Sequence, residues 1–144
     1  MVKEFLLSTL SPLCKELHMG EDEVIASDIL SHRYCKFKGE LNSDFSDADL
    51  LKKLHPTPAL GGTPRMQALD FIRRHEPFER GWYGAPIGWL SKEEADFAVG
   101  IRSALIEKEE MHLFAGAGIV EGSLAEKEWE ETENKMAAYL RLLL

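Results

Sequence analysis

The sequence predicts an α+β fold, an antiparallel sheet packed with helices, and three observations favour it. Strand-like and helix-like segments follow one another without the regular strand–helix–strand alternation of α/β proteins. Short charged turns at 91–94 and 108–110 separate the last strand-like segments, as in an antiparallel meander. Hydrophobic residues make up 44% of the 144 residues, so the chain can form one core. We therefore treat residues 1–144 as one domain's worth of chain.

The first third of the chain is expected to contain two helices and at least one strand. A helix is expected over 2–18, where apolar residues recur at helical spacing: Val2, Phe5, Leu6, Leu10, Leu13 and Leu17. Residues 23–31 form either a short helix or a strand, because periodicity does not decide between them, and 33–41 form a strand. A second helix is expected over 47–54, with Ser46 as its N-cap.

Prolines and glycines divide the rest of the chain into elements. Residues 55–62 hold two prolines and two glycines, which predicts a loop without regular structure. Pro64 is expected at the first position of a helix that runs through Arg74. The remaining expected elements are strands over 81–90, 95–107 and 111–120 and a helix over 124–143.

Charge and composition exclude several classes of protein. The net charge is −8 and the lysines and arginines are scattered among acids, which argues against nucleic-acid binding. No stretch approaches the ~18 apolar residues of a membrane span, and no secretion signal is visible. Cys14 and Cys35 are too few for a disulfide framework. We expect a cytoplasmic protein with reduced thiols.

The last predicted helix carries acidic side chains on one flank. Ser123 and Glu126 have the spacing of a capping box, which would fix the start of this helix. The predicted core stripe consists of Trp129, Met136, Leu140 and Leu143. Glu128, Glu131 and Lys135 lie outside this stripe, among the apolar residues Leu124, Tyr139 and Leu142. A run of charges is usually a solvated face, but partly buried carboxylates need a partner or a cation.

Glu128 and Glu131 are three residues apart, so both can point at one site. Two carboxylates with few other polar groups suit Mg²⁺, which binds one or two protein oxygens together with substrate oxygens. They do not suit zinc, which prefers nitrogen and sulfur ligands.

Anion-binding groups are predicted near the same helix. Arg102 faces opposite to Val99 and Ile101 on its expected strand, where it is either a surface arginine or a bidentate clamp on a carboxylate. Gly116 and Gly118 form either a tight connection or a turn whose N–H groups bind an anion at the helix start. We expect these groups and the Glu131 flank to meet in one pocket.

Tyr83 is a core residue by default. Glycines at 81, 84 and 88 indicate that another group approaches this segment closely. Taken alone, His32 and His55 are more often structural than catalytic, and no Ser-His-Asp or Cys-His nucleophile arrangement is visible.

Several segments together resemble the C-terminal part of chorismate-utilising enzymes, and within that superfamily they look most like isochorismate synthase. The matching segments are His32 followed by Gly39 and Leu41, and the strings at 54–65, 79–88, 97–103 and 114–135. Arg33 departs from the pattern, which usually has leucine there. Salicylate-forming relatives place threonine where Ala59 stands, and anthranilate-type relatives carry a different version of the 55–59 string.

The resemblance implies an α+β chorismate-binding fold and a cleft for chorismate or isochorismate. The residues it implies for substrate binding are His32, Ala59, Leu60, Tyr83, Arg102, Gly116, Gly118 and Lys135. It implies Mg²⁺ as cofactor, with Glu131 as a direct ligand and Glu128 direct or through water. The implied reaction adds water to the second ring carbon and expels hydroxide from the fourth, in menaquinone or siderophore biosynthesis.

Family enzymes are much longer, and their general base (lysine), general acid (glutamate) and another metal glutamate precede the segment that resembles this chain. We therefore expect a C-terminal portion of an isochorismate synthase that lacks the N-terminal portion, is inactive alone and self-associates through uncovered faces. The alternatives are a salicylate- or anthranilate-type enzyme, which Ala59 and the 55–59 string disfavour, and a free-standing binding domain without catalysis.

Overall fold

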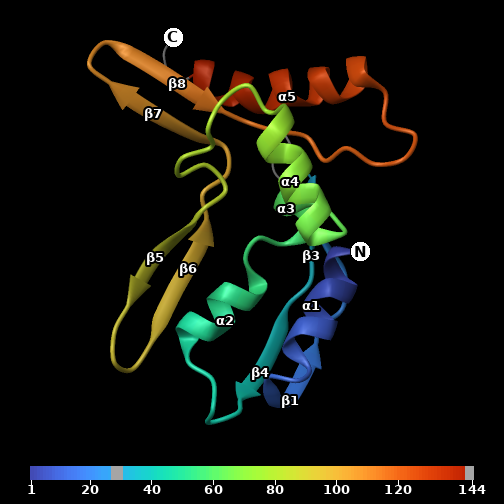
Figure 1. Ribbon diagram of the computed structural model, residues 1–144, viewed down its shortest axis with the longest axis vertical. Coiled ribbons are helices and arrows are strands. Elements are labelled where there is room, and N and C mark those ends of the chain that lie inside the picture. Colours follow the sequence, from blue (N-terminus) through green and yellow to red (C-terminus); the bar gives the residue numbers. More distant parts are fainter. Residues whose placement is uncertain (27–30, 142–144) are drawn as a thin grey trace. The chain divides into compact units, whose positions relative to one another are not determined.

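The computed structural model describes residues 1–26 and 31–141. The chain forms two compact units, Met1–His55 and Pro56–Leu144, each built from helices and antiparallel strand pairs (Figure 1). The predicted α+β class is confirmed. Among the described residues, no helix combines the length and the hydropathy that a membrane crossing needs.

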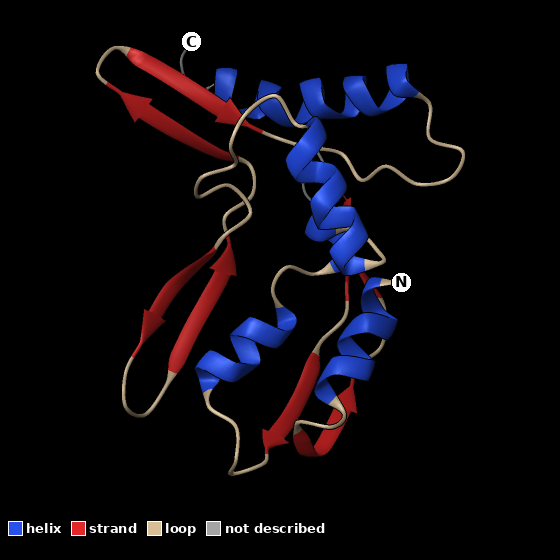
Figure 2. Ribbon diagram, in the orientation of Figure 1, coloured by secondary structure: helices blue, strands red, loops and turns tan. Residues whose placement is uncertain are grey.

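The first unit contains two helices and two strand pairs. Its elements are α1 (Val2–Leu10), β1 (Cys14–Met19), β2 (Glu23–Ala26), β3 (Ser31–Tyr34), β4 (Phe37–Leu41) and α2 (Asp47–Leu54). Strand β1 pairs with β4 and β2 pairs with β3, both antiparallel (Figure 2). Leu13, between α1 and β1, is only 2% exposed and is the buried hydrophobic residue of the described chain.

The helix predicted over 2–18 exists, but its predicted length is wrong. Helix α1 ends at Leu10, because Pro12 has no amide hydrogen to continue the ladder. Leu17 therefore lies in a strand, opposite Gly39. The strand predicted over 33–41 is two strands, and the undecided segment 23–31 is a strand over Glu23–Ala26, with 27–30 outside the described residues.

The second predicted helix is confirmed together with its cap. The Ser46 hydroxyl accepts a hydrogen bond from the Asp49 amide at 3.2 Å. The Asp49 carboxylate in turn accepts from the Ser46 amide at 3.0 Å, which completes a capping box. This arrangement lowers the pKa of Asp49, chiefly through its hydrogen bond with the Ser46 side chain.

The second unit contains three helices and two hairpins. Its elements are α3 (Pro58–Gly61), α4 (Arg65–His75), β5 (Pro86–Leu90), β6 (Ala95–Val99), β7 (Ser103–Glu107), β8 (Glu110–Phe114) and α5 (Ala125–Leu140). Strand β5 pairs with β6 and β7 pairs with β8, and each pair is a separate two-stranded antiparallel sheet (Figure 2).

The predicted three-stranded meander is wrong, because the expected strand over 95–107 breaks. Strand β6 ends at Val99 and β7 starts at Ser103, with Arg102 between them in the left-handed region at φ 49°. That backbone conformation cannot continue a pleated strand. The strands therefore form two separate hairpins, β5–β6 and β7–β8.

Three further boundaries differ from expectation. Residues 58–61 form a single helical turn with Pro58 at its first position, where the missing amide costs nothing. Helix α4 begins at Arg65, one residue after Pro64. Strand β5 begins only at Pro86, because residues 81–84 form a turn with positive φ at Gly81 and Gly84.

Helix α5 lacks the predicted capping box. It is capped by Leu124 without a side-chain hydrogen bond, because the Ser123 hydroxyl accepts instead from the Val120 amide at 3.1 Å. The predicted core stripe is also wrong for Trp129 and Leu140, which are 68% and 51% exposed. Leu143 lies outside the described residues.

Candidate functional site

A cavity of about 360 Å³ opens in the second unit and gathers most of the predicted site residues. Those that line it are Ala59, Leu60, Tyr83, Arg102, Gly116, Gly118 and Lys135. They come from α3, the turn before β5, the β6–β7 link, the segment after β8, and α5. Segments far apart in the sequence thus contribute to one concave surface within one unit.

Arg102 reaches the cavity because of its backbone conformation. The Ile101 amide donates to the Val99 carbonyl at 2.8 Å, which makes a tight turn just before Arg102. Val99, Ile101 and Arg102 all line the cavity. The predicted alternation, with Arg102 facing away from the other two, is therefore wrong: the turn replaces the pleat.

Lys135 is an enclosed cation of the site, with its side chain 15% exposed. Its Nζ donates to the Gly116 carbonyl at 2.9 Å and to Glu131 Oε1 at 2.5 Å. The lysine therefore joins the glycine segment to α5 and carries a positive charge at the cavity wall.

The prediction that the glycine segment lies at the start of α5 is wrong. Helix α5 begins at Ala125, well after Gly118, because an extended stretch and a turn intervene. Gly116 instead lies beside Lys135, eleven positions into the helix. The helix N-terminus therefore does not supply this site, and the cationic groups come from the flank of α5 and from the β6–β7 link.

Tyr83 lies against Phe114 and Gly116. The two rings are stacked with centroids 5.9 Å apart. A Cβ on residue 116 would lie 2.9 Å from the Tyr83 hydroxyl, so only glycine fits without a shift. Burial raises the pKa of Tyr83, and the nearby Arg80 opposes this. Tyr83 is therefore a neutral hydroxyl, able to donate and accept, at neutral pH.

Neither predicted metal ligand lines the cavity, although Glu131 contacts Lys135, which does. Glu128 is half-buried, and Glu131 is 51% exposed and bound to Lys135. Within the described part of the chain, no group of three or more His, Cys, Asp or Glu could hold a metal. Two adjacent carboxylates fit Mg²⁺, which takes its other ligands from water and substrate, and do not fit zinc.

His32 lies on β3, opposite Ile25, in the first unit. Its side chain lies outside what the structure describes.

Sequence reasoning missed several residues of the cavity wall: Thr57, Glu76, Phe78, Arg80, Ala115 and Ala117. Glu76 and Arg80 carry opposite charges, and their spacing of four residues is a signal that could have identified an ion pair. Phe78 packs edge-on against Phe114, at 6.2 Å between centroids.

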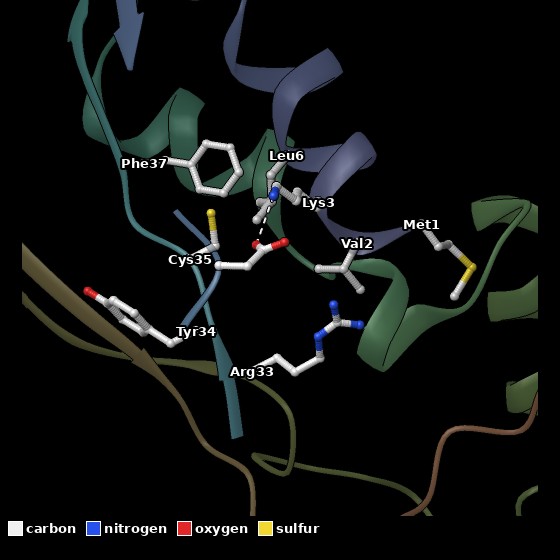
Figure 3. Close-up of a pocket in the computed structure, with 9 residues that line it drawn as sticks. Met1, Val2, Lys3, Leu6, Arg33, Tyr34, Cys35 and Phe37 are labelled. Carbon is white, nitrogen blue, oxygen red and sulfur yellow. Dashed lines mark hydrogen bonds and ion pairs between the residues drawn. The ribbon is translucent and has the colours of Figure 1, made fainter. Parts of the chain in front are cut away.

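The first unit has a cavity of its own, of about 540 Å³. Figure 3 shows Lys3 in an ion pair, which it makes with Asp22 at 2.8 Å, while Arg33, Cys35 and Phe37 also line the space. The hydrogen bond from Lys3 lowers the pKa of Asp22. Lys3 and Asp22 compensate each other, and none of the predicted site residues whose side chains the structure describes lines this cavity.

Comparisons with known proteins point to one family. The family model described as chorismate binding enzyme matches residues 1–144. The chain is 46% identical over 132 residues to isochorismate synthase MenF of Bacillus subtilis, covering 90% of this chain and 28% of that protein. It is 53% identical over 90 residues to a salicylate biosynthesis isochorismate synthase of Pseudomonas aeruginosa, covering 62% and 19%.

Solved structures agree with this. The 2,3-dihydroxybenzoate-specific isochorismate synthase DhbC of Bacillus anthracis matches with a TM-score of 0.91 at 36% identity, over 99% of this chain and 39% of that chain. The menaquinone-specific MenF of Escherichia coli matches with a TM-score of 0.84 at 40% identity, over 99% and 33%. The chain therefore spans well under half the length of these proteins.

Proposed function

Because the chain belongs to the family of chorismate-binding enzymes, we propose that the protein containing it converts chorismate into isochorismate. One observation carries the proposal: Tyr83, Arg102 and Lys135 line a single cavity. Chorismate is a small dianion with two carboxylates, and two cations with a neutral hydroxyl between apolar walls suit such a ligand.

Each of these groups has a defined role in the proposal. The Arg102 guanidinium forks onto one carboxylate, and Lys135 and the Tyr83 hydroxyl bind the other polar groups. Leu60 and Ala59 shape the wall against the ring. Gly116 and Gly118 let the backbone approach closely, since neither presents a side chain to the ligand.

Mg²⁺ would be held by Glu131, with Glu128 direct or through water. When bound, it neutralises the ring carboxylate of the substrate and orients the ring. The Lys135 ammonium bonds to Glu131 at 2.5 Å, so the lysine and the metal would share this carboxylate.

The residues that move protons are proposed to lie outside this chain. Water adds at the second ring carbon while hydroxide leaves the fourth, which needs a general base on one ring face and a general acid on the other. The lysine and glutamate that the family resemblance implies for these roles precede this segment. The described chain binds and orients the substrate, and the N-terminal portion of the same polypeptide supplies the base and the acid.

Exposed apolar side chains support this division. Those of the second unit include Ile87, Trp89 and Leu90 on β5, Leu105 and Ile106 on β7, and Trp129 and Leu140 on α5. Large apolar faces on a soluble protein are usually covered by another part of the protein or by a partner. We propose that the N-terminal portion covers these faces.

The 144-residue chain produced alone is therefore expected to self-associate and to turn over no chorismate. Its uncovered strand edges and apolar faces would pair with other copies. Light scattering at rising protein concentration would measure the association. A monodisperse monomer at high concentration, or turnover by this chain alone, would contradict the proposal.

The full-length protein with chorismate and Mg²⁺ tests the function itself, with the products separated by chromatography. Isochorismate is the expected product, and excess chelator should remove the activity and added Mg²⁺ restore it. Salicylate or anthranilate as product would favour the alternative chemistry, which Ala59 disfavours. Binding of chorismate without any product would favour a non-catalytic binding domain.

No single pathway is proposed, since the similar proteins are named for menaquinone, salicylate and 2,3-dihydroxybenzoate formation. We propose a cytoplasmic enzyme that serves either menaquinone or siderophore biosynthesis.

A further inference from the structure

We propose that Arg80 is a positioning residue for the reaction, because it holds together two walls of the substrate cavity without binding the substrate itself. This inference rests on the proposed function. Arg80 follows α4 and lines the cavity with Glu76, which caps the end of that helix. Neither the sequence patterns nor the family resemblance assigned either residue a role.

The guanidinium of Arg80 is already engaged on several sides. Its Nε donates to Glu76 Oε2 at 2.7 Å, and its Nη2 donates to Oε1 of the same carboxylate at 2.5 Å. Its Nη1 donates to the Leu60 carbonyl at 2.9 Å. This is a bidentate pair plus a third hydrogen bond, a geometry that only the planar fork of arginine provides.

Arg80 also contacts Tyr83, another residue of the cavity wall. Its guanidinium carbon lies 5.9 Å from the centre of the Tyr83 ring, within reach of a cation–π interaction. Leu60 meets the same turn, since one of its methyl groups lies 3.8 Å from the position of a Cβ on Gly84. Arg80 thus fixes Leu60 and Tyr83 relative to each other, and both line the cavity.

Burial and charge favour a positioning role over a direct contact with substrate. Glu76 and Arg80 are each 28% exposed, whereas the ion pair Lys15–Glu40 has partners 54% and 68% exposed. A carboxylate beside a cavity for an anionic ligand is unfavourable unless it is neutralised. Arg80 neutralises Glu76, and the hydrogen bond with Glu76 raises the pKa of Arg80.

A direct electrostatic role would give different results from a positioning role. If Arg80 only attracted the anionic substrate, Arg80→Lys would keep most of the activity. Glu76→Gln would keep or improve it, since a repelling negative charge is removed. If Arg80 positions Leu60 and Tyr83, both changes are harmful, because lysine cannot make the three hydrogen bonds and glutamine loses the bidentate pair.

The experiment measures kcat and KM for chorismate in the full-length protein, for Arg80→Lys, Glu76→Gln and the double variant Glu76→Gln/Arg80→Gln. Melting temperatures identify conditions in which each variant is folded. The matched control is the ion pair between Asp70 and Arg74. These two residues are also four positions apart, but they lie on α4 and are 46% and 69% exposed. Arg74→Lys and Asp70→Asn should leave kcat and KM within twofold.

We expect Arg80→Lys and Glu76→Gln each to lower kcat/KM by about 10- to 100-fold, with a fall in kcat as well as a rise in KM, because a misplaced wall misaligns the bound ring. Glu76→Gln retaining or raising kcat/KM would overturn the inference, as would Arg80→Lys within twofold of wild type. If Arg80→Lys does not fold, the test rests on Glu76→Gln and on the double variant. In the double variant neither residue of the pair carries a charge. Absence of turnover by the wild type would instead defeat the proposed function.

Discussion

Replacing Arg102 with glutamine is expected to lower kcat/KM for chorismate by about 30- to 4,000-fold, the equivalent of roughly 2–5 kcal/mol for losing one partner of an enclosed charge pair. Arg102 is half-buried and lines the cavity at the β6–β7 link. Glutamine keeps a similar length and hydrogen-bonding capacity but has no charge and no bidentate fork. The loss should appear mainly in KM, since a substrate carboxylate is present in both the ground state and the transition state.

Backbone strain does not confound this experiment. Arg102 has φ 49°, a conformation that non-glycine residues seldom adopt, and glutamine would bear the same cost there. The melting temperatures of Arg102→Gln and the wild type would show that the variant is folded under the assay conditions. Arg73→Gln on the exposed part of α4 is the charge-matched control and should not change kcat/KM. A fall of less than threefold in Arg102→Gln would remove Arg102 from the proposed binding site.

A local signal in the sequence predicted the cap of α2 correctly but not the cap of α5, where Ser123 and Glu126 form no capping box. Ser46 and Asp49 form their capping box because all the groups involved lie within one helical turn. The turn at Arg102 was not predictable in this way, since positive φ is normally signalled by glycine or asparagine, and the apolar alternation of 95–107 continues through the break. A rule that considers a few neighbours could not detect a conformation that the surrounding fold imposes.

The apolar stripe of α5 shows a different limit. Periodicity predicted which residues share a face of the helix, but burial depends on what lies opposite that face. Trp129 is 68% exposed because nothing in the described chain covers it. An amphipathic pattern therefore predicts a surface that needs a partner, and here that partner is proposed to be the N-terminal portion of the full-length protein.

Seven of the predicted site residues line one cavity, but how they are arranged there was not predictable from the sequence. The family resemblance named Tyr83, Arg102 and Lys135, which line one cavity. It did not indicate that Lys135 bonds to the carbonyl of Gly116, or that Arg80 ties Leu60 to the Tyr83 turn. The hydrogen bonds from Lys135 to Gly116 and from Arg80 to Leu60 join residues 19 and 20 positions apart, and their geometry follows from packing that the spacing of residues does not encode.

Replacing Lys135 with methionine is expected to lower kcat/KM for chorismate by about 10²- to 10³-fold, the range found when one aligned donor is removed from an active site. Lys135 is 15% exposed, and its ammonium group bonds to the Gly116 carbonyl and the Glu131 carboxylate. Methionine fills a similar volume and leaves Glu131, which is half exposed, hydrated by solvent. Steady-state kinetics with chorismate would measure the loss.

The same substitution should affect Mg²⁺ in the opposite direction, which separates a role in substrate binding from general damage. Removing the lysine charge leaves Glu131 more available to a second cation and abolishes the repulsion between the two. The Mg²⁺ concentration for half-maximal activity should therefore fall while KM for chorismate rises. Lys127→Met, on the exposed face of α5, should change neither quantity. If Lys135→Met raised both, the lysine would be supporting the shape of the site, and the assignment of Glu131 as the carboxylate shared between lysine and metal would be wrong.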